Sequence, residues 1–247
     1  MGLFNQYQKE GKGVSKDQKT PRFILFFQIY FRRFWNLITL NFLYIVFCIP
    51  IVTIGPATAA MTKILRNYAR EEHAFLWGDF IETFKKNFKQ AFFFSLIDFF
   101  LTAFLILDLL CVWNLPNQIL FTLSLAGILF TFLVFTFMKF YIYNMMVTFD
   151  LKLKDLIKNA FIFVWAAFLK NILTAALLAG LFLIVYHLPI QFILLIVVSL
   201  YFTTNGYIVN FMVNPTIKKF MMDGYDPKTG EKIEEEKYEG FEDEAAD

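Results

Sequence analysis

Long apolar runs dominate the pattern of hydrophobic and polar positions along the chain. Three runs contain no charged residue, at 34–53, 119–138 and 189–213. Two more are interrupted, the run at 92–113 by Asp98 and Asp108 and the run at 161–188 by Lys170. A run of about 18 or more apolar residues is typical of a membrane helix, because about 20 residues cross the roughly 30 Å hydrocarbon layer. The pattern therefore predicts five long membrane spans.

The segments between these runs predict shorter helices. A first helix is expected over 21–47, with Arg32 and Arg33 at the membrane surface, and a second over 57–70. Pro50, Gly55 and Pro56 lie between these two helices and prevent one continuous helix. In residues 77–90, apolar residues recur at spacings of three and four, and lysines occupy the other face. This pattern predicts an amphipathic helix in the headgroup plane. A similar interfacial helix is expected over 152–160.

The second half of the chain contains a weak internal repeat. The segment WNLPNQIL at 113–120 matches YHLPIQFI at 186–193 with an offset of 73, and both share Leu-Pro-x-Gln. A basic segment precedes each apolar run, FKKNF at 84–88 and LIKNAF at 156–161. The repeat predicts two helical hairpins with a proline at each tip, and Pro50 places a third hairpin before them.

These patterns predict an all-α polytopic membrane bundle of three helical hairpins, with five long spans and one short return helix. The expected boundaries are a basic arm at 1–20, a membrane domain at 21–219 and an acidic disordered tail at 220–247. Within the membrane domain, the hairpins cover 21–72, 91–143 and 161–213. Both late tips lack Lys and Arg, whereas the connections between hairpins are basic, and basic loops remain in the cytoplasm. This places both termini in the cytoplasm. A five-span alternative, in which 57–70 lies on the membrane surface, would place the N-terminus outside.

Composition agrees with this class and adds little chemistry. Phenylalanine accounts for 34 residues, and the net charge is +2. Cys48 and Cys111 lie within apolar runs without a metal-type or redox spacing, so they are interpreted as apolar filling residues. The two histidines are expected on opposite sides of the membrane, and no phosphate-binding glycine loop is present. We expect no catalysis, no cofactor, no bound metal and no nucleic-acid partner.

Polar residues inside the predicted spans are the better candidates for a functional site, because ionisable groups in hydrocarbon are costly. The candidates are Asp98, Lys170, Asp108, Lys63 and Asn41. When the two basic segments are aligned with each other, the offset is 72 residues, and Asp98 then aligns with Lys170. If the two hairpins run parallel, this acid and base lie at the same depth and form an ion pair. The alternative is that Lys170 reaches the headgroups while Asp98 forms a local hydrogen bond. Lys139, at the end of its span, is expected to reach the headgroups.

The segment FWNLITLNFLYIVFCIPIVTIGPATAAMTKILRNYAREE at 34–72, followed by GDFIETFKKNFKQAF at 78–92, resembles the YesL family of bacterial membrane proteins of unknown function. The resemblance covers about 21–219 and rests on LNFLY, PIVTIGPATAA and FKKNFKQ. The positions of this sequence that carry the motif are Pro50, Thr53, Gly55, Pro56, Thr58 and Asn87. Lys63 departs from the family, which more usually has an apolar residue there.

The resemblance implies a bacterial inner-membrane protein that accompanies carbohydrate uptake systems of the ATP-binding-cassette type. It implies no reaction and no catalytic residue. We therefore expect a non-enzymatic accessory of a transport system, which contacts the lipid bilayer and other membrane proteins. The alternative is a small membrane transporter with a polar pathway between its hairpins. The sequence does not predict the oligomeric state.

Overall fold

The computed structural model describes residues 21–113 and 116–222. The basic arm and almost all of the acidic tail lie outside these residues. The described part is 88% helical and contains no strand, which confirms the all-α prediction. Four of its helical segments are long and apolar enough to cross a membrane, so the chain is a membrane protein: Leu76–Val112, Gln118–Met146, Phe168–Tyr186 and Ile190–Met222.

The N-terminal region forms three short helices rather than one long span and a return. The first helix is interrupted at Arg33, which separates α1 (Arg22–Arg32) from α2 (Phe34–Cys48). A single 3-10 turn, Ile51–Thr53, leads into α3 (Ile54–Ala69). The 15 residues of α2 extend about 22 Å, which is less than the roughly 30 Å hydrocarbon layer. The predicted long span at 34–53 is therefore wrong, because Pro50 ends the helix before it is long enough.

Helix α3 is the centre of the molecule. Twelve of its 16 residues are buried, and it packs against α2, α4, α5 and α9. Its first turn approaches α4 (Leu76–Val112) so closely that a Cβ on Gly55 would lie 2.3 Å from the Ala91 carbonyl oxygen. A Cβ on Gly206 of α9 (Phe202–Ile217) would lie 2.6 Å from Leu65. Close packing between helices therefore explains Gly55, the glycine of the PIVTIGPATAA motif.

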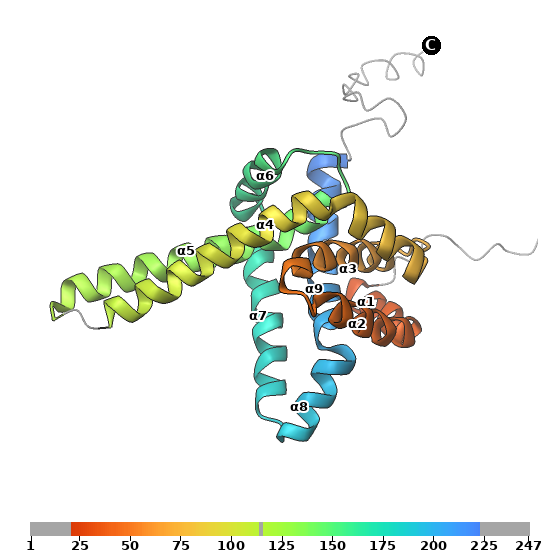
Figure 1. The fold of residues 1–247 in the computed structure, drawn as a ribbon, viewed down its shortest axis with the longest axis horizontal. Helices are drawn as coiled ribbons and strands as arrows, with labels where there is room; N and C mark the ends of the chain where they lie inside the picture. The colour runs from red at the N-terminus through yellow and green to blue at the C-terminus, as the bar shows by residue number, and fades with distance from the viewer. Residues whose placement is uncertain (1–20, 114–115, 223–247) are drawn as a thin grey trace, which may run out of the picture.

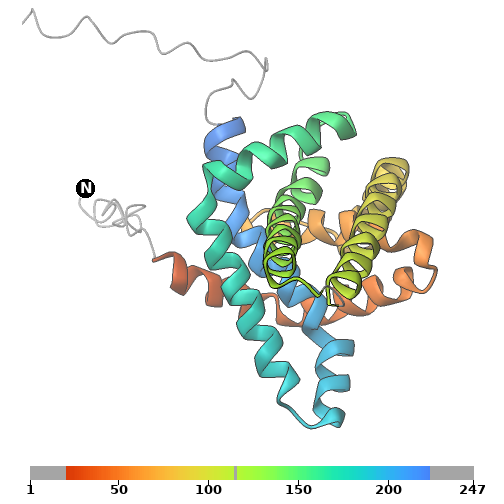
Figure 2. The same cartoon turned by 90° about the vertical axis from the view of Figure 1, so that its left-hand side faces the viewer.

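Two long hairpins extend from this centre. Helices α4 and α5 (Gln118–Met146) form the first, with Pro116 at its tip. Helix α7 (Phe168–Tyr186) pairs with α8 (Ile190–Ile196) and α9 in the second, with Pro189 at its tip. Both tips lie where the repeat predicts them. Figures 1 and 2 show that the hairpins diverge from the base instead of running parallel. Residues related by the repeat therefore do not lie at the same depth.

The two expected interfacial helices have different outcomes. Residues 77–90 are not a separate helix, because α4 continues without a break for 37 residues and contains no proline. By contrast, α6 (Leu153–Ala166) is a distinct helix that ends at Ala167, but it is longer than the expected 152–160. The last predicted span also differs, since a π-helical segment at Val197–Tyr201 separates α8 from α9. A second π-helical segment, Lys218–Met222, extends past the predicted domain end at 219.

Candidate functional site

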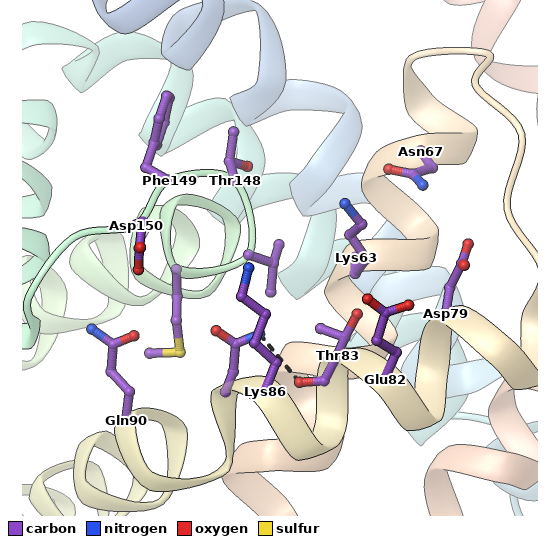
Figure 3. Close-up of a pocket in the computed structure, with 13 residues that line it drawn as sticks. Lys63, Asn67, Asp79, Glu82, Thr83, Lys86, Gln90, Thr148, Phe149 and Asp150 are labelled. Carbon is purple, nitrogen blue, oxygen red and sulfur yellow. Dashed lines mark hydrogen bonds between the residues drawn. The ribbon is translucent and has the colours of Figure 1, made fainter.

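One face of the first part of α4 lines a polar pocket of about 440 Å³. The residues recur at helical spacing, so their side chains lie along one stripe of the helix. They are Asp79, Glu82, Thr83, Lys86, Asn87 and Gln90. Opposite the stripe lie Lys63 and Asn67 of α3 and the segment 146–150, which contains the last residue of α5 and the chain that follows it. The sequence predicted that this part of α4 would point its charges at headgroups, whereas Figure 3 shows several of them directed into a shared space.

Arg66 fixes the wall of the pocket that follows α5. Its guanidinium donates to the Val147 carbonyl at 2.9 Å and to the Thr148 hydroxyl at 2.8 Å. It also donates to the Asn67 side-chain oxygen, at 2.9 Å through one terminal nitrogen. Burial lowers the pKa of Arg66 to about 10, with a smaller contribution from the nearby Arg70. Arg66 is buried and holds α3 against the chain that leaves α5, so it positions both sides of the pocket.

The charged side chains of the pocket are not in direct contact with each other. Lys63 and Lys86 share the pocket with Asp79, Glu82 and Asp150, yet none of these five makes an ion pair within 4.0 Å among the described residues. Lys63 is half-buried, and its pKa is lowered by burial first and by the Arg66 guanidinium second. The site therefore contains charged groups of both signs without a protein counterion in contact.

Packed side chains close the pocket toward the hairpin. The next residues on the pocket side of α4, Ala91 and Phe94, have no exposed surface. On α5, Ile142 and Met145 are also fully buried, next to the pocket residues Met146 and Val147. These side chains belong to one hydrophobic cluster. The polar pocket therefore does not continue along α4 as a polar path into the hairpin.

A second, apolar crevice of about 630 Å³ lies beyond these packed residues. It is lined by the turn between α2 and α3 and by α4, including the exposed Phe99 and Phe100. Asp98 is on its wall and accepts a hydrogen bond from the Lys139 ammonium at 3.1 Å. Thr102 also donates to the same carboxylate, at 3.3 Å.

The ion pair between Asp98 and Lys170, one of the two alternatives for these residues, does not form. Asp98 pairs with Lys139 of the adjacent helix α5, which was expected to reach the headgroups instead. Lys170 lies on α7, in the other hairpin, and its ammonium donates to the Thr216 hydroxyl at 3.3 Å. The divergence of the hairpins explains the error, because the repeat register assumed that they run in parallel.

Two buried asparagines donate hydrogen bonds to backbone carbonyls at positions where the regular hydrogen-bonding pattern of a helix is interrupted. Asn41 donates to the carbonyls of Val197 and Val198 and accepts from the Thr203 amide at 3.1 Å. Asn171 donates to the carbonyls of Phe163 and Val164, next to the break at Ala167. Asn41 was predicted as a polar candidate, and the structure assigns it this packing role.

The remaining predicted residues fall in three places. Lys63 and Asn87 line the polar pocket. Asp108 is half-buried in the last part of α4, near the tip of the hairpin. The motif residues Pro50, Thr53, Gly55, Pro56 and Thr58 form the turn and first part of α3, where the Thr53 hydroxyl donates to the carbonyls of Phe47 and Pro50.

Sequence reasoning missed several residues of the polar pocket. Glu82, Lys86 and Asp150 line it without having been singled out, and Arg66 positions it. The available signal was the polar stripe of α4, whose spacing of three and four matches that of the apolar face. We assigned the charged face to the lipid headgroups, because the spacing alone does not distinguish a face toward headgroups from a face toward α3.

Residues 37–109 match a protein family described as "Protein of unknown function, DUF624". The match covers 73 of the 247 residues, from α2 through most of α4, and so includes the α3 and α4 walls of the pocket. No curated protein and no solved structure matches the chain.

Proposed function

We propose that this protein is a non-enzymatic accessory of a membrane transport system and acts by binding another membrane protein. The observation that carries the proposal is the solid packing between the two polar parts of α4. Ala91 and Phe94 separate the polar pocket from the Asp98–Lys139 pair, and both are fully buried. The described residues form no polar route past this point, and a protein that acts by binding another membrane protein needs none.

The apolar crevice supplies the proposed binding surface. Its lining includes Ile51, Val52 and Phe99, which are exposed within the chain itself. The ion pair at its wall adds a polar anchor, and polar groups facing a helix interface strengthen association in lipid by about 1 kcal/mol. This combination fits a helix of a membrane partner.

Photo-crosslinking in intact membranes tests this proposal. A photoreactive phenylalanine analogue at Phe100, in the crevice, should give one discrete protein adduct. The same analogue at Phe182, exposed on α7 of the other hairpin, is the matched control and should not give that adduct. Identical adduct patterns at both positions, or lipid adducts alone at Phe100, would contradict the proposal.

The finer assignment is also part of this proposal. We place the protein with the YesL-like members of its matched family, in a bacterial inner membrane with both termini in the cytoplasm. The partner is then a component of an ATP-binding-cassette-type uptake system that transports a carbohydrate. The support is the PIVTIGPATAA motif at 50–60, which builds the α3–α4 contact. Mass spectrometry of the Phe100 adduct tests the assignment, and a partner that is not part of a transporter would overturn it.

A second candidate function is a small transporter in its own right. The unpaired charges of the polar pocket favour it, because substrate sites of transporters lie in polar pockets between helices. Solute uptake into proteoliposomes that contain only this protein would support this candidate, and such uptake would contradict the accessory proposal.

A further inference from the structure

The polar pocket is assembled from segments that are far apart in the sequence and contains both exposed charged residues and buried polar residues. Three separate segments contribute to it: α3, the first part of α4, and the chain after α5. Thr83 and Asn87 are more than nine-tenths buried, and both line the cavity. The Asn87 amide nitrogen donates to the Thr83 carbonyl at 3.1 Å, but among the described residues its side-chain oxygen and the Thr83 hydroxyl make no hydrogen bond. Two polar atoms of these mostly buried residues therefore remain available to a ligand.

The charges define which ligand is compatible with the pocket. An anion would meet Lys63 and Lys86 but also the carboxylates of Asp79, Glu82 and Asp150. A cation would meet the carboxylates but also the two ammonium groups. In the view of Figure 3, the two ammonium groups lie between Asp150 on one side and Glu82 with Asp79 on the other. A ligand with both charges can place each one next to an opposite charge, and charge-assisted hydrogen bonds are the strongest of this kind.

We infer that this pocket binds a small zwitterion, a molecule with one primary ammonium group and one carboxylate or phosphate group. Lys63 and Lys86 hold its anionic group, and Glu82 with Asp79 or Asp150 holds its ammonium group. Asn67, Thr83 and Asn87 supply hydrogen bonds to the part between the two charges. The volume of about 440 Å³ lies in the range of small-molecule sites, roughly 300–1,000 Å³.

Two sources share this chemistry. One is a soluble amino acid or short peptide. The other is the phosphoethanolamine headgroup of a membrane lipid, since the pocket lies on α4 just before the residues that enter the apolar hairpin. The inference concerns the zwitterion itself and is independent of the proposed accessory role, because binding at the pocket needs no partner protein.

Thermal unfolding of the full chain in phosphatidylcholine nanodiscs tests the soluble source. The probes are glycylglycine as the zwitterion, succinate as a dianion and putrescine as a dication. A ligand that binds only the folded state raises Tm as its concentration exceeds Kd. We expect glycylglycine to raise Tm by at least about 2 °C in a saturable manner, and succinate and putrescine to have less than half this effect.

Variants assign the effect to the pocket. Lys63→Gln and Glu82→Gln remove one charge of each sign and should each abolish the glycylglycine shift. Lys85→Gln removes an exposed lysine of α4 that does not line the pocket, and should retain it. Glu82 is exposed, so its variant keeps the test valid if Lys63→Gln does not fold.

A second arm tests the lipid source. In phosphatidylethanolamine nanodiscs without peptide, the Tm difference between the native chain and Glu82→Gln should exceed that in phosphatidylcholine nanodiscs. A positive result in either arm supports the zwitterion site and identifies its source. The inference is overturned if neither arm gives a shift, if succinate or putrescine matches glycylglycine, or if the shift persists in both Lys63→Gln and Glu82→Gln.

Discussion

Lys139 is the partner of Asp98 because the two side chains lean toward each other. Each Cα–Cβ bond of a helix tilts toward the N-terminus of that helix. Helices α4 and α5 are antiparallel neighbours, so Asp98 leans away from the hairpin tip and Lys139 leans toward it. The ammonium also lies 5.5 Å from the centre of the Phe135 ring, which adds a cation–π contact.

Breaking this pair from one side should destabilise the protein. We expect Asp98→Ala and Lys139→Ala each to lower the free energy of unfolding in detergent by about 2 kcal/mol, less than for a fully buried pair because both side chains are about 30% exposed. The double variant should recover part of the loss, because neither charge is then left alone. Calorimetry or circular dichroism measures the effect.

Lys170→Ala is the matched control for this prediction. Lys170 contacts Thr216 and not Asp98, so its effect should add to that of Asp98→Ala without recovery. Additive losses for Asp98→Ala with Lys139→Ala would mean that the ion pair does not contribute to stability.

At the scale of elements, the glycine at the start of α3 decides how closely α3 and α4 pack. A Cβ at Gly55 would lie 2.3 Å from the Ala91 carbonyl oxygen and 2.8 Å from the Ser95 side chain. The carbonyl oxygen belongs to the backbone, so a substitution must move a helix rather than a side chain. Gly127 and Gly180 have no atom within 4 Å of a corresponding Cβ, although they also lie in helices.

Alanine substitutions at these glycines should therefore have opposite effects. We expect Gly55→Ala to lower stability by about 1–3 kcal/mol, the usual cost of overpacking. Gly127→Ala and Gly180→Ala should be neutral or stabilising by up to about 1 kcal/mol, because alanine is the better helix former. Thermal unfolding of the three variants in one detergent measures the difference, and equal Tm values for Gly55→Ala and Gly127→Ala would refute the close contact.

The turn between α2 and α3 is suited to an apolar environment, whether lipid or a partner helix. Ile49 and Ile51 are each more than 75% exposed, so the turn presents apolar side chains outward. The Thr53 hydroxyl occupies the carbonyls of Phe47 and Pro50, which lipid cannot satisfy. The turn shares the apolar crevice with Phe99 and Phe100, from which α4 continues for 12 residues, or about 18 Å, to Val112. We therefore expect α2 and α3 to enter the hydrocarbon layer and return without crossing it.

Cysteine accessibility tests this re-entrant arrangement. In a chain with Cys48 and Cys111 replaced, Ile51→Cys should resist an impermeant thiol reagent both in intact cells and in inverted vesicles, and should react once detergent is added. Asp150→Cys, in the pocket wall, should react in inverted vesicles and serves as the control. Reaction of Ile51→Cys in intact cells would show that α2 and α3 cross the membrane.

The sequence predicted elements well where hydrophobicity alone decides them. Both late hairpins and their proline tips follow from apolar runs and helix breakers. The breaks at Ala167 and Val197–Tyr201 could not be predicted, because no glycine or proline marks them. Asn171 satisfies carbonyls beside the first break, and Asn41, which is distant in the sequence, satisfies carbonyls at the second. The pocket was missed for a similar reason, since a polar stripe does not reveal whether it faces water or α3.

At the scale of the whole molecule, the two hairpins share a packed base around α3 and diverge from it (Figures 1 and 2). Few residues in the spanning part of α4, and none in that of α5, are buried within the chain. Exposed apolar helices of this length require lipid or a membrane partner around them. The polar pocket lies at the end of the first hairpin opposite its tip, so we expect the membrane to separate the pocket from Pro116.

Cysteine labelling of the hairpin tips in intact cells tests this account most directly. The expected positions of the pocket, the hairpins and the re-entrant turn relative to the membrane all assume the same orientation of the chain. In the background without Cys48 and Cys111, Asn117→Cys and Ile190→Cys should react with an impermeant thiol reagent. Ser15→Cys and Lys228→Cys, at the two ends of the chain, should not react until the cells are opened. Labelling of both ends together with protection of both tips would invert the protein in the membrane, and labelling of Ser15→Cys alone would replace the arrangement with one in which α1 to α3 cross the membrane an odd number of times.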